Sequence, residues 1–411
     1  MRIFAIVLFC FSLSRLFAQD RAFALPEAID YALKNNASIV AAEHRVESQR
    51  QLKKTSFDLP KTEVSLLYGQ YNGYAKNDNN ITITQSIPFL ALGSRSRLNR
   101  SLIASSELGK AVTENDLVFQ VKQTYYLLAH AYSTRNLMLQ QDSIFEGFYR
   151  AASARFKAGE TNLLEQTTAE AQRNEAKNRV RQIDSDIAAL KSHFRSLLNT
   201  DDLPDIIDKS LTEIQLTVSL DSGAINSNPT LAYSRQQIDV AEAEKKVLAA
   251  RAAPDFLIGY FNQTLIGVED LESGAFATSG DRFAGIQVGV AIPIWFGPHQ
   301  GRTRAAEYTR RAAESKHTFT QRTMDGQFQQ AIQSYEKNKN SLAYYRESGL
   351  PNADLILKQS QAAFRNGEIA YAEYLLGLRN ANSIRENYLQ TLNDYNQSIL
   401  FIEFLSGNKL N

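Results

Sequence analysis

Five histidines are the side chains of this 411-residue chain best suited to bind a metal ion or transfer a proton near neutral pH. They are scattered, without the spacing of a metal site, at His44, His130, His193, His299 and His317. Beyond residue 18 the methionines are only Met138 and Met324, so no copper-binding methionine cluster is predicted. We expect no metal and no cofactor.

The motifs of nucleophilic and phosphate chemistry are missing as well. The sequence contains no glycine-rich phosphate loop, no G-x-S-x-G elbow and no H-E-x-x-H motif. The acidic pair Asp201-Asp202 begins a loop, where solvation explains it. Charges nearly cancel, with 45 basic and 44 acidic residues, which argues against a nucleic-acid partner. The sequence therefore predicts a protein that is not an enzyme.

Residues 1–18 read as a secretory signal peptide. Arg2 precedes an apolar run, Ala18 is a small residue at its end, and cleavage is expected before Gln19. A membrane anchor is the alternative, but Arg15 leaves the run too short to span a bilayer comfortably. The only cysteine, Cys10, lies in this segment, so the mature chain is expected to lack disulfides and thiol chemistry.

The chain repeats itself. FKAGE at 156–160 returns as FRNGE at 364–368, 208 residues later. Other landmarks return in the same order: NASI at 36 as NPTL at 228, Pro60 as Pro254, and SIPF at 86 as AIPI at 291. Their offsets are 192, 194 and 205, so the largest change falls between the last two. Two copies of one structural unit are predicted.

Each copy should contain a helix, two strands, a long helix and a return helix. The first repeat is expected at 19–200, a linker or equatorial segment at 201–227, and the second repeat at 228–407. We predict first helices at about 26–58 and 230–252, and strands at about 61–72, 79–88, 255–264 and 283–294. Long helices are predicted at 94–157, 161–199, 302–366 and 369–407. Pro351 should bend or break its helix near Gly349–Pro351.

The helices carry a coiled-coil pattern. The span 94–157 contains no proline and would be about 95 Å long as a helix, which suits a coiled coil or a helical tube. Apolar residues at alternating spacings of three and four mark a seam in each return helix. They are Val180, Ile183, Ile187, Leu190, Phe194 and Leu197 in the first, and Tyr388, Leu392, Tyr395, Ile399 and Ile402 in the second.

The four strands alternate apolar residues with small or polar ones. Each is about ten residues long, as a tilted membrane-spanning strand would be. Tyr68, Tyr71, Tyr260 and Trp295 lie near predicted strand ends and are candidates for an aromatic girdle. A soluble hairpin with one face packed on a core is the alternative for any single pair. Four strands cannot close a barrel, so membrane-spanning strands would require several chains, eight strands in a dimer or twelve in a trimer.

The duplicated order of elements, with its two FxxGE turns, resembles the TolC-type outer membrane factors. The resemblance covers about residues 20–407. It implies a mainly α fold with a membrane β-barrel portion: a homotrimer with a twelve-stranded barrel in outer membrane lipid and a periplasmic helical barrel. It also implies an exit duct working with a periplasmic adaptor (membrane fusion protein) and an inner-membrane transporter of RND or ABC type. Heavy-metal efflux is one candidate branch. Type I secretion is an alternative, as is a secreted coiled-coil protein of structural or adhesive role.

The resemblance also implies roles for particular residues. The two turns would dock the adaptor through Lys157, Ala158, Gly159, Glu160, Arg365, Asn366, Gly367 and Glu368. Glu373, with Glu165 as its counterpart in the first repeat, matches an acidic position at the pore aperture. Leu376 occupies the place of a second acidic residue, which puts a double acidic ring in doubt. The alternative for these residues is a purely structural role in the helical hairpins.

Overall fold

The structure, a computed structural model, describes residues 21–221 and 223–407, so the predicted signal peptide lies outside the described residues. The chain divides into two units. Unit 2 is formed by Glu43–Lys110 and Thr230–Thr320; unit 1 takes in the residues up to Ala42, Ala111–Pro229 and the residues from Gln321 onward. Each repeat contributes to both units.

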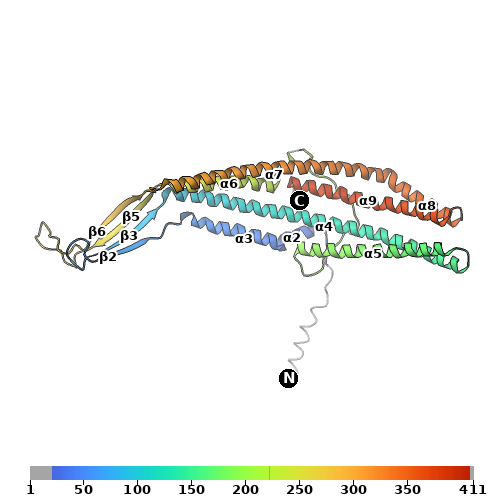
Figure 1. Cartoon of the computed structure of the whole chain (residues 1–411), viewed down its shortest axis with the longest axis horizontal. Coiled ribbons are helices and arrows are strands. Elements are labelled where there is room, and N and C mark those ends of the chain that lie inside the picture. Colours follow the sequence, from blue (N-terminus) through green and yellow to red (C-terminus); the bar gives the residue numbers. More distant parts are fainter. Residues whose placement is uncertain (1–20, 222, 408–411) are drawn as a thin grey trace, which may run out of the picture. The chain divides into compact units, whose positions relative to one another are not determined.

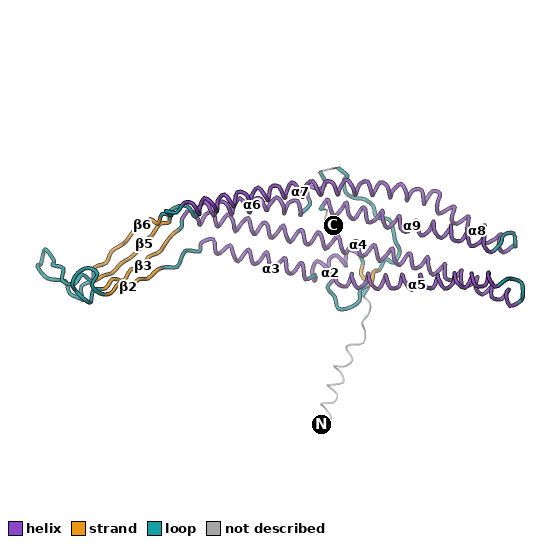
Figure 2. Tube along the Cα trace, in the orientation of Figure 1, coloured by secondary structure: helices purple, strands orange, loops and turns teal. Residues whose placement is uncertain are grey.

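Unit 2 contains a four-stranded antiparallel sheet, ordered β2-β3-β5-β6 (Figures 1 and 2). Its strands are β2 (Glu63–Tyr68), β3 (Asn79–Ile87), β5 (Asp255–Gln263) and β6 (Phe283–Ala291). The helices entering and leaving it are α3 (Ala37–Leu52), followed by a 3-10 turn at Lys53–Phe57, α4 (Phe89–Lys157), α6 (Pro229–Ala250) and α7 (Phe296–Tyr344). All four strands begin or end within a few residues of the predicted bounds; β2 is shorter, ending at Tyr68.

Unit 1 is helical apart from one small sheet. Its remaining helices are α2 (Leu25–Asn35), α5 (Leu163–Leu198), α8 (Leu350–Arg365), α9 (Tyr371–Ser406) and a 3-10 turn at Ala224–Ser227. The predicted seams are buried at their centres, with Ile187, Phe194 and Leu197 on α5 and Leu392, Tyr395, Ile399 and Ile402 on α9. In the described part of the chain, no helix has both the length and the apolar character needed to cross a bilayer.

The helix expected at 26–58 is in fact divided, which corrects the prediction. Asn36 separates α2 from α3 in an extended conformation, and its side-chain oxygen accepts a hydrogen bond of 2.8 Å from the Ser38 backbone N–H. This is the behaviour of an N-capping asparagine, which competes with helix continuation. The last turn before the first strand is a 3-10 helix, Lys53–Phe57.

The segment 201–227, expected as a linker, contributes a strand. β4 (Asp205–Ile206) pairs in parallel with β1 (Ala22–Phe23). The buried Asp205 carboxylate accepts a hydrogen bond from Tyr132 at 2.7 Å and forms ion pairs with Lys191 and Lys209 at 3.0 and 2.9 Å. Although burial opposes it, these partners hold the pKa of Asp205 below its usual value. The hydrogen bond to Tyr132 and the ion pair with Lys191 therefore hold the segment around Asp205 against α4 and α5.

The long helix of the second repeat changes its hydrogen-bond pattern just before Pro351. α7 ends at Tyr344, a π-helical turn spans Tyr345–Gly349, and α8 begins at Leu350. Proline has no N–H to give to the ladder, and a π turn is a common way to absorb that defect. A Cβ built on Gly349 would lie 2.8 Å from the Tyr345 ring, so glycine allows the two to pack closely. The bend predicted for Gly349 and Pro351 stays a prediction.

Candidate functional site

One face of the sheet in unit 2 is apolar and exposed. Cross-strand register aligns Val64 with Ile83, Ile83 with Tyr260, and Tyr260 with Ile286, and cross-strand partners share a face. The apolar face comprises Val64, Leu66, Tyr68, Ile81, Ile83, Phe256, Ile258, Tyr260, Ile286, Val288 and Val290, which are 41–77% exposed. A patch of this kind needs a partner or a lipid phase.

The opposite face is made mostly of small and polar residues. It carries Ser65, Thr82, Thr84, Ser86, Gly259, Gly285, Gln287 and Gly289, together with the apolar Leu67, Leu257 and Phe261. The Phe261 ring covers Gly285, its direct cross-strand partner. A lipid-facing strand alternates in this way when its other side faces a polar interior.

The sheet has two open edges in the described part of the chain. β2 pairs only with β3, and β6 only with β5, so each outer strand presents unpaired backbone groups. An open, apolar edge is a template for pairing with another chain.

The predicted girdle residues lie at different heights on the sheet. Tyr68 ends β2, and Tyr71 follows in the loop with its hydroxyl buried and without a partner among the described residues. Trp295 lies between β6 and α7 and is 81% exposed. Tyr260 lies three residues before the last residue of β5, so it is nearer the middle of the apolar face than its end. Sequence reasoning missed Phe57 and Phe89, which are also exposed where strands meet helices.

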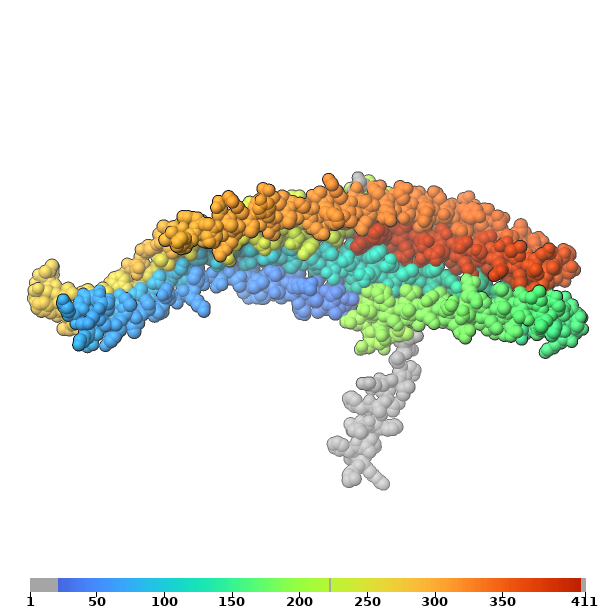
Figure 3. All heavy atoms as spheres, in the orientation of Figure 1, coloured from blue at the N-terminus to red at the C-terminus, as the bar shows by residue number. Residues whose placement is uncertain are grey.

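The two hairpin turns of unit 1 are closed by the same set of backbone hydrogen bonds. They lie in the green and the orange-red parts of the chain in Figure 3. Glu160 N–H donates to the Arg155 carbonyl at 2.9 Å, and Glu368 N–H donates to the Ala363 carbonyl at 2.8 Å. Gly159 and Gly367 have φ of 75° and 73°, the left-handed conformation that closes such a C-cap. All eight predicted docking residues, 157–160 and 365–368, are exposed.

The two glutamates assigned to the aperture cap the return helices. The Asn162 side chain accepts from Glu165 N–H at 2.9 Å, and the Glu165 carboxylate binds Arg155 at 2.9 Å. The Glu373 carboxylate accepts from the Ala370 backbone N–H at 3.0 Å. Both carboxylates therefore stabilise a helix start. Leu376 is exposed one turn after Glu373.

An aromatic cluster, not foreseen from sequence, joins the two hairpins of unit 1. The Phe148 ring contacts Phe364, Tyr371 and Tyr374 at centroid distances of 5.8, 5.8 and 4.8 Å. Burial raises the pKa of Tyr371 to about 12, helped by the nearby Glu165 carboxylate. The Tyr371 hydroxyl has no hydrogen-bond partner among the described residues. The only sequence signal was aromatic residues around each FxxGE turn.

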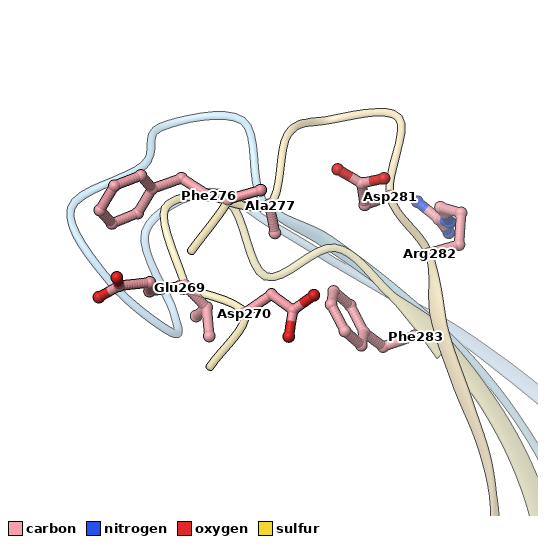
Figure 4. Close-up of a pocket in the computed structure, with 9 residues that line it drawn as sticks. Glu269, Asp270, Phe276, Ala277, Asp281, Arg282 and Phe283 are labelled. Atoms are coloured by element: carbon pink, nitrogen blue, oxygen red, sulfur yellow. The ribbon is translucent and has the colours of Figure 1, made fainter. Parts of the chain in front are cut away.

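The 264–282 loop and Phe283 line a half-open pocket of about 450 Å³ (Figure 4). Two of its acidic side chains accept hydrogen bonds from within the loop. Asp270 accepts from the Glu272 N–H and the Ser273 hydroxyl, and Asp281 accepts from the Thr278 N–H and hydroxyl. Among residues 21–221 and 223–407, no three His, Cys, Asp or Glu side chains cluster as metal ligands. The loop is therefore stabilised by its own hydrogen bonds and connects β5 to β6.

Comparisons with known proteins identify the fold. A sequence model of the outer membrane efflux protein family matches residues 220–408. A search of curated proteins finds no match. CusC, whose crystal structures concern transmembrane channel formation, superposes with a TM-score of 0.76 at 17% identity, covering 97% of this chain and 96% of CusC. The Campylobacter jejuni CmeC outer membrane channel gives a TM-score of 0.77 at 15% identity, covering 93% and 85%.

The open state of the Neisseria gonorrhoeae MtrE outer membrane channel gives a TM-score of 0.73 at 16% identity, covering 96% of this chain and 93% of MtrE. The predicted fold class, a duplicated unit of helices that shares one four-stranded sheet per chain, is confirmed. The family and the similar structures are channels rather than enzymes. Residues 220–408 therefore match the outer membrane efflux protein family, and the chain as a whole has the fold of the CmeC and MtrE outer membrane channels.

Proposed function

We propose that three copies of this chain form the outer membrane exit duct of a tripartite efflux assembly. The observation that carries the proposal is the exposed apolar face on a four-stranded sheet with two open edges. In hydrocarbon every backbone N–H and C=O must be paired, so an open sheet cannot stand alone there. Pairing β6 of one copy with β2 of the next removes both edges at once.

The number of copies follows from the strand count. Two copies would give an eight-stranded barrel, whose interior side chains fill, whereas three give about twelve strands and can leave a channel. The interior would be lined by the face of Ser65, Thr82, Thr84, Gln287 and the glycines. A duct for solutes needs the wider barrel, which supports the trimer.

The helical hairpins of unit 1 would face the periplasmic adaptor. Their two turns present the same backbone geometry and eight exposed residues, with Lys157, Glu160, Arg365 and Glu368 giving each turn one positive and one negative charge. Repeated, rigid turns of this kind suit an adaptor that grips equivalent sites. We place the choice of cargo in the inner-membrane transporter. Heavy-metal efflux and type I secretion therefore remain alternatives that this partner's identity would separate.

The native mass of the protein, extracted from purified outer membranes in mild detergent, tests the proposal. We expect a particle of three chains whose gel migration changes on heating. A monomer or dimer released without detergent would instead support a secreted coiled-coil scaffold, which leaves the apolar face of the sheet unexplained.

We further propose that Glu373 contributes a ring of three carboxylates at the aperture of the trimer. Such a ring attracts cations and repels anions. Glu373→Ala should lower the cation preference in single-channel recordings. Unchanged ion selectivity would show that Glu373 does not line the aperture.

A further inference from the structure

All four junctions between strands and helices lie at one end of the sheet in unit 2. The register pairs Glu63 with Thr84, Ile87 with Phe256 and Asp255 with Ala291, so β2 and β5 begin where β3 and β6 end. We call the residues of these junctions the collar: 53–63, 88–100, 251–255 and 292–304. The loops 69–78 and 264–282 lie at the other end of the sheet.

The collar is strongly basic, whereas the chain as a whole is nearly neutral. It holds nine Lys and Arg and three Asp and Glu residues, a net charge of +6 with histidine neutral, against +1 for the whole chain. The two loops at the other end hold two basic and five acidic residues, a net charge of −3. The apolar face thus lies between a positive end and a negative end, so the two ends would meet different surroundings.

An Arg-x-Arg pair recurs at the same place in both repeats. Arg95 and Arg97 follow β3, and Arg302 and Arg304 follow β6 with an offset of 207, in step with the other landmarks. Arg97, Arg302 and Arg304 are exposed, and within 21–221 and 223–407 none has a hydrogen bond or ion pair from its side chain. Two turns further along α7, Arg310 binds Glu307 and Glu314.

Among the described residues, Arg97, Arg302 and Arg304 thus have no acidic partner, in contrast to Arg310. No acidic residue lies in the first turn of α4 or α7, although acidic residues stabilise that position in an ordinary helix. The collar also exposes large aromatic side chains, namely Phe57, Phe89, Trp295 and Phe296. Aromatic rings beside free cations, at the edge of an apolar band, suit the boundary between hydrocarbon and headgroups.

We propose that the collar binds the headgroup phosphates of anionic phospholipids in the membrane leaflet nearest the helices. The inference rests on the proposed function, since it needs the apolar face to lie in lipid. Guanidinium groups form paired, charge-assisted hydrogen bonds with phosphate, and each basic residue near an anionic surface strengthens binding about fivefold. The sites would therefore select the protein's lipid neighbours and fix the height of the sheet in the membrane.

Trp295 offers a local reporter. It is the only tryptophan of the chain, it is 81% exposed, and it lies in the collar seven residues before Arg302. Lipids brominated near the headgroup quench tryptophan fluorescence on contact. The protein is reconstituted in vesicles of brominated phosphatidylcholine, brominated phosphatidylglycerol and mixtures of the two. The quenching curve gives the relative affinity of the Trp295 site for the anionic lipid.

The collar variant removes three unpaired charges through Arg97→Gln/Arg302→Gln/Arg304→Gln. It is compared with a control variant, Arg181→Gln/Arg195→Gln/Arg322→Gln. The control removes three exposed arginines of α5 and α7 outside the collar. We expect the preference for phosphatidylglycerol in the wild type and in the control, and a fall of about 100-fold in the collar variant. Replacing the same three arginines with lysine should keep most of the preference, and this variant guards against misfolding of the glutamine variant.

The outcomes separate the two proposals. Equal quenching by both lipids in the wild type would overturn the lipid site while leaving the membrane duct intact. An unchanged lipid preference in the collar variant, with altered anion selectivity in channel recordings, would also overturn it, because the arginines would then face the channel. If neither brominated lipid quenches Trp295, the apolar face is not in the membrane and the proposed function falls with the inference.

Discussion

Two glycines on one face of β6 should respond oppositely to the same substitution. Gly285 and Gly289 are four residues apart, and their cross-strand partners are Phe261 and Leu257. A Cβ built on Gly285 would lie 2.5 and 2.7 Å from atoms of the Phe261 ring, closer than carbon atoms approach without bonding. A Cβ on Gly289 would lie 3.6 Å from Leu257, an ordinary van der Waals contact.

The expected magnitudes follow from these distances. Gly285→Ala forces the Phe261 ring out of its rotamer and off the sheet, and such overpacking costs about 1–3 kcal/mol. Gly289→Ala meets no clash and restricts the unfolded chain, so it should be neutral or stabilise by about 0.5–1 kcal/mol. The clash involves only the far ring atoms, so Phe261→Leu should relieve it. The double variant Phe261→Leu/Gly285→Ala should then be less destabilised than the sum of its single variants.

The measurement is the temperature at which the assembled protein, purified in detergent, changes its gel mobility, confirmed by denaturant titration. Gly285→Ala should lower this temperature, and Gly289→Ala should leave it unchanged or raise it. Equal behaviour of the two glycine variants, or strict additivity with Phe261→Leu, would refute the packing of Phe261 over Gly285.

Three further predictions concern other parts of the chain. Lys122 and Glu403 form a buried ion pair at 3.3 Å in unit 1, so Glu403→Gln should cost about 3–5 kcal/mol in unfolding experiments, and adding Lys122→Met should recover most of it. Burial lowers the pKa of Lys122, so the free energy of unfolding should rise with pH from that lowered pKa toward 10.5, where only the unfolded chain still holds the proton. Burial raises the pKa of Tyr371 to about 12. The contribution of its neutral hydroxyl to the free energy of unfolding is complete below pH 10 and should fall between pH 10 and 12. Tyr371→Phe should abolish that fall. Val288→Arg on the apolar face should cost about 2–4 kcal/mol and reduce recovery of trimer from membranes, whereas Gln287→Arg on the other face should not.

The parts of the fold that could be predicted are those governed by local rules. Strand faces follow from a period of two, so the alternation of Ile286, Val288 and Val290 was readable before any pairing was known. The hairpin turns were readable because Gly159 and Gly367 meet a local backbone need. Duplication then doubled each weak signal, since the same landmark had to appear twice in order.

The parts that could not be predicted depend on partners far away in the sequence. β1 and β4 are two residues each and pair across more than 180 positions, too short to leave a periodic pattern. The buried ion pair of Lys122 and Glu403 joins residues 281 positions apart, and each alone reads as an ordinary helix charge. The break at Asn36 had a local cause, but a continuous helical pattern on both sides concealed it.

The duplicated turns also show why equivalent positions need not share a function. Glu165 and Glu373 occupy the same place in the two repeats, 208 residues apart. Glu165 is only 19% exposed, and Arg155 and Thr161 bind its carboxylate. In the second repeat the equivalent residues are Ala363 and Ile369, whose side chains can neither pair with a carboxylate nor donate a hydrogen bond to it. Among the described residues Glu373 forms no ion pair, and it stays exposed. If carboxylates attract cations at the aperture, the second repeat supplies them, while the first repeat uses the same residue to hold its turn together.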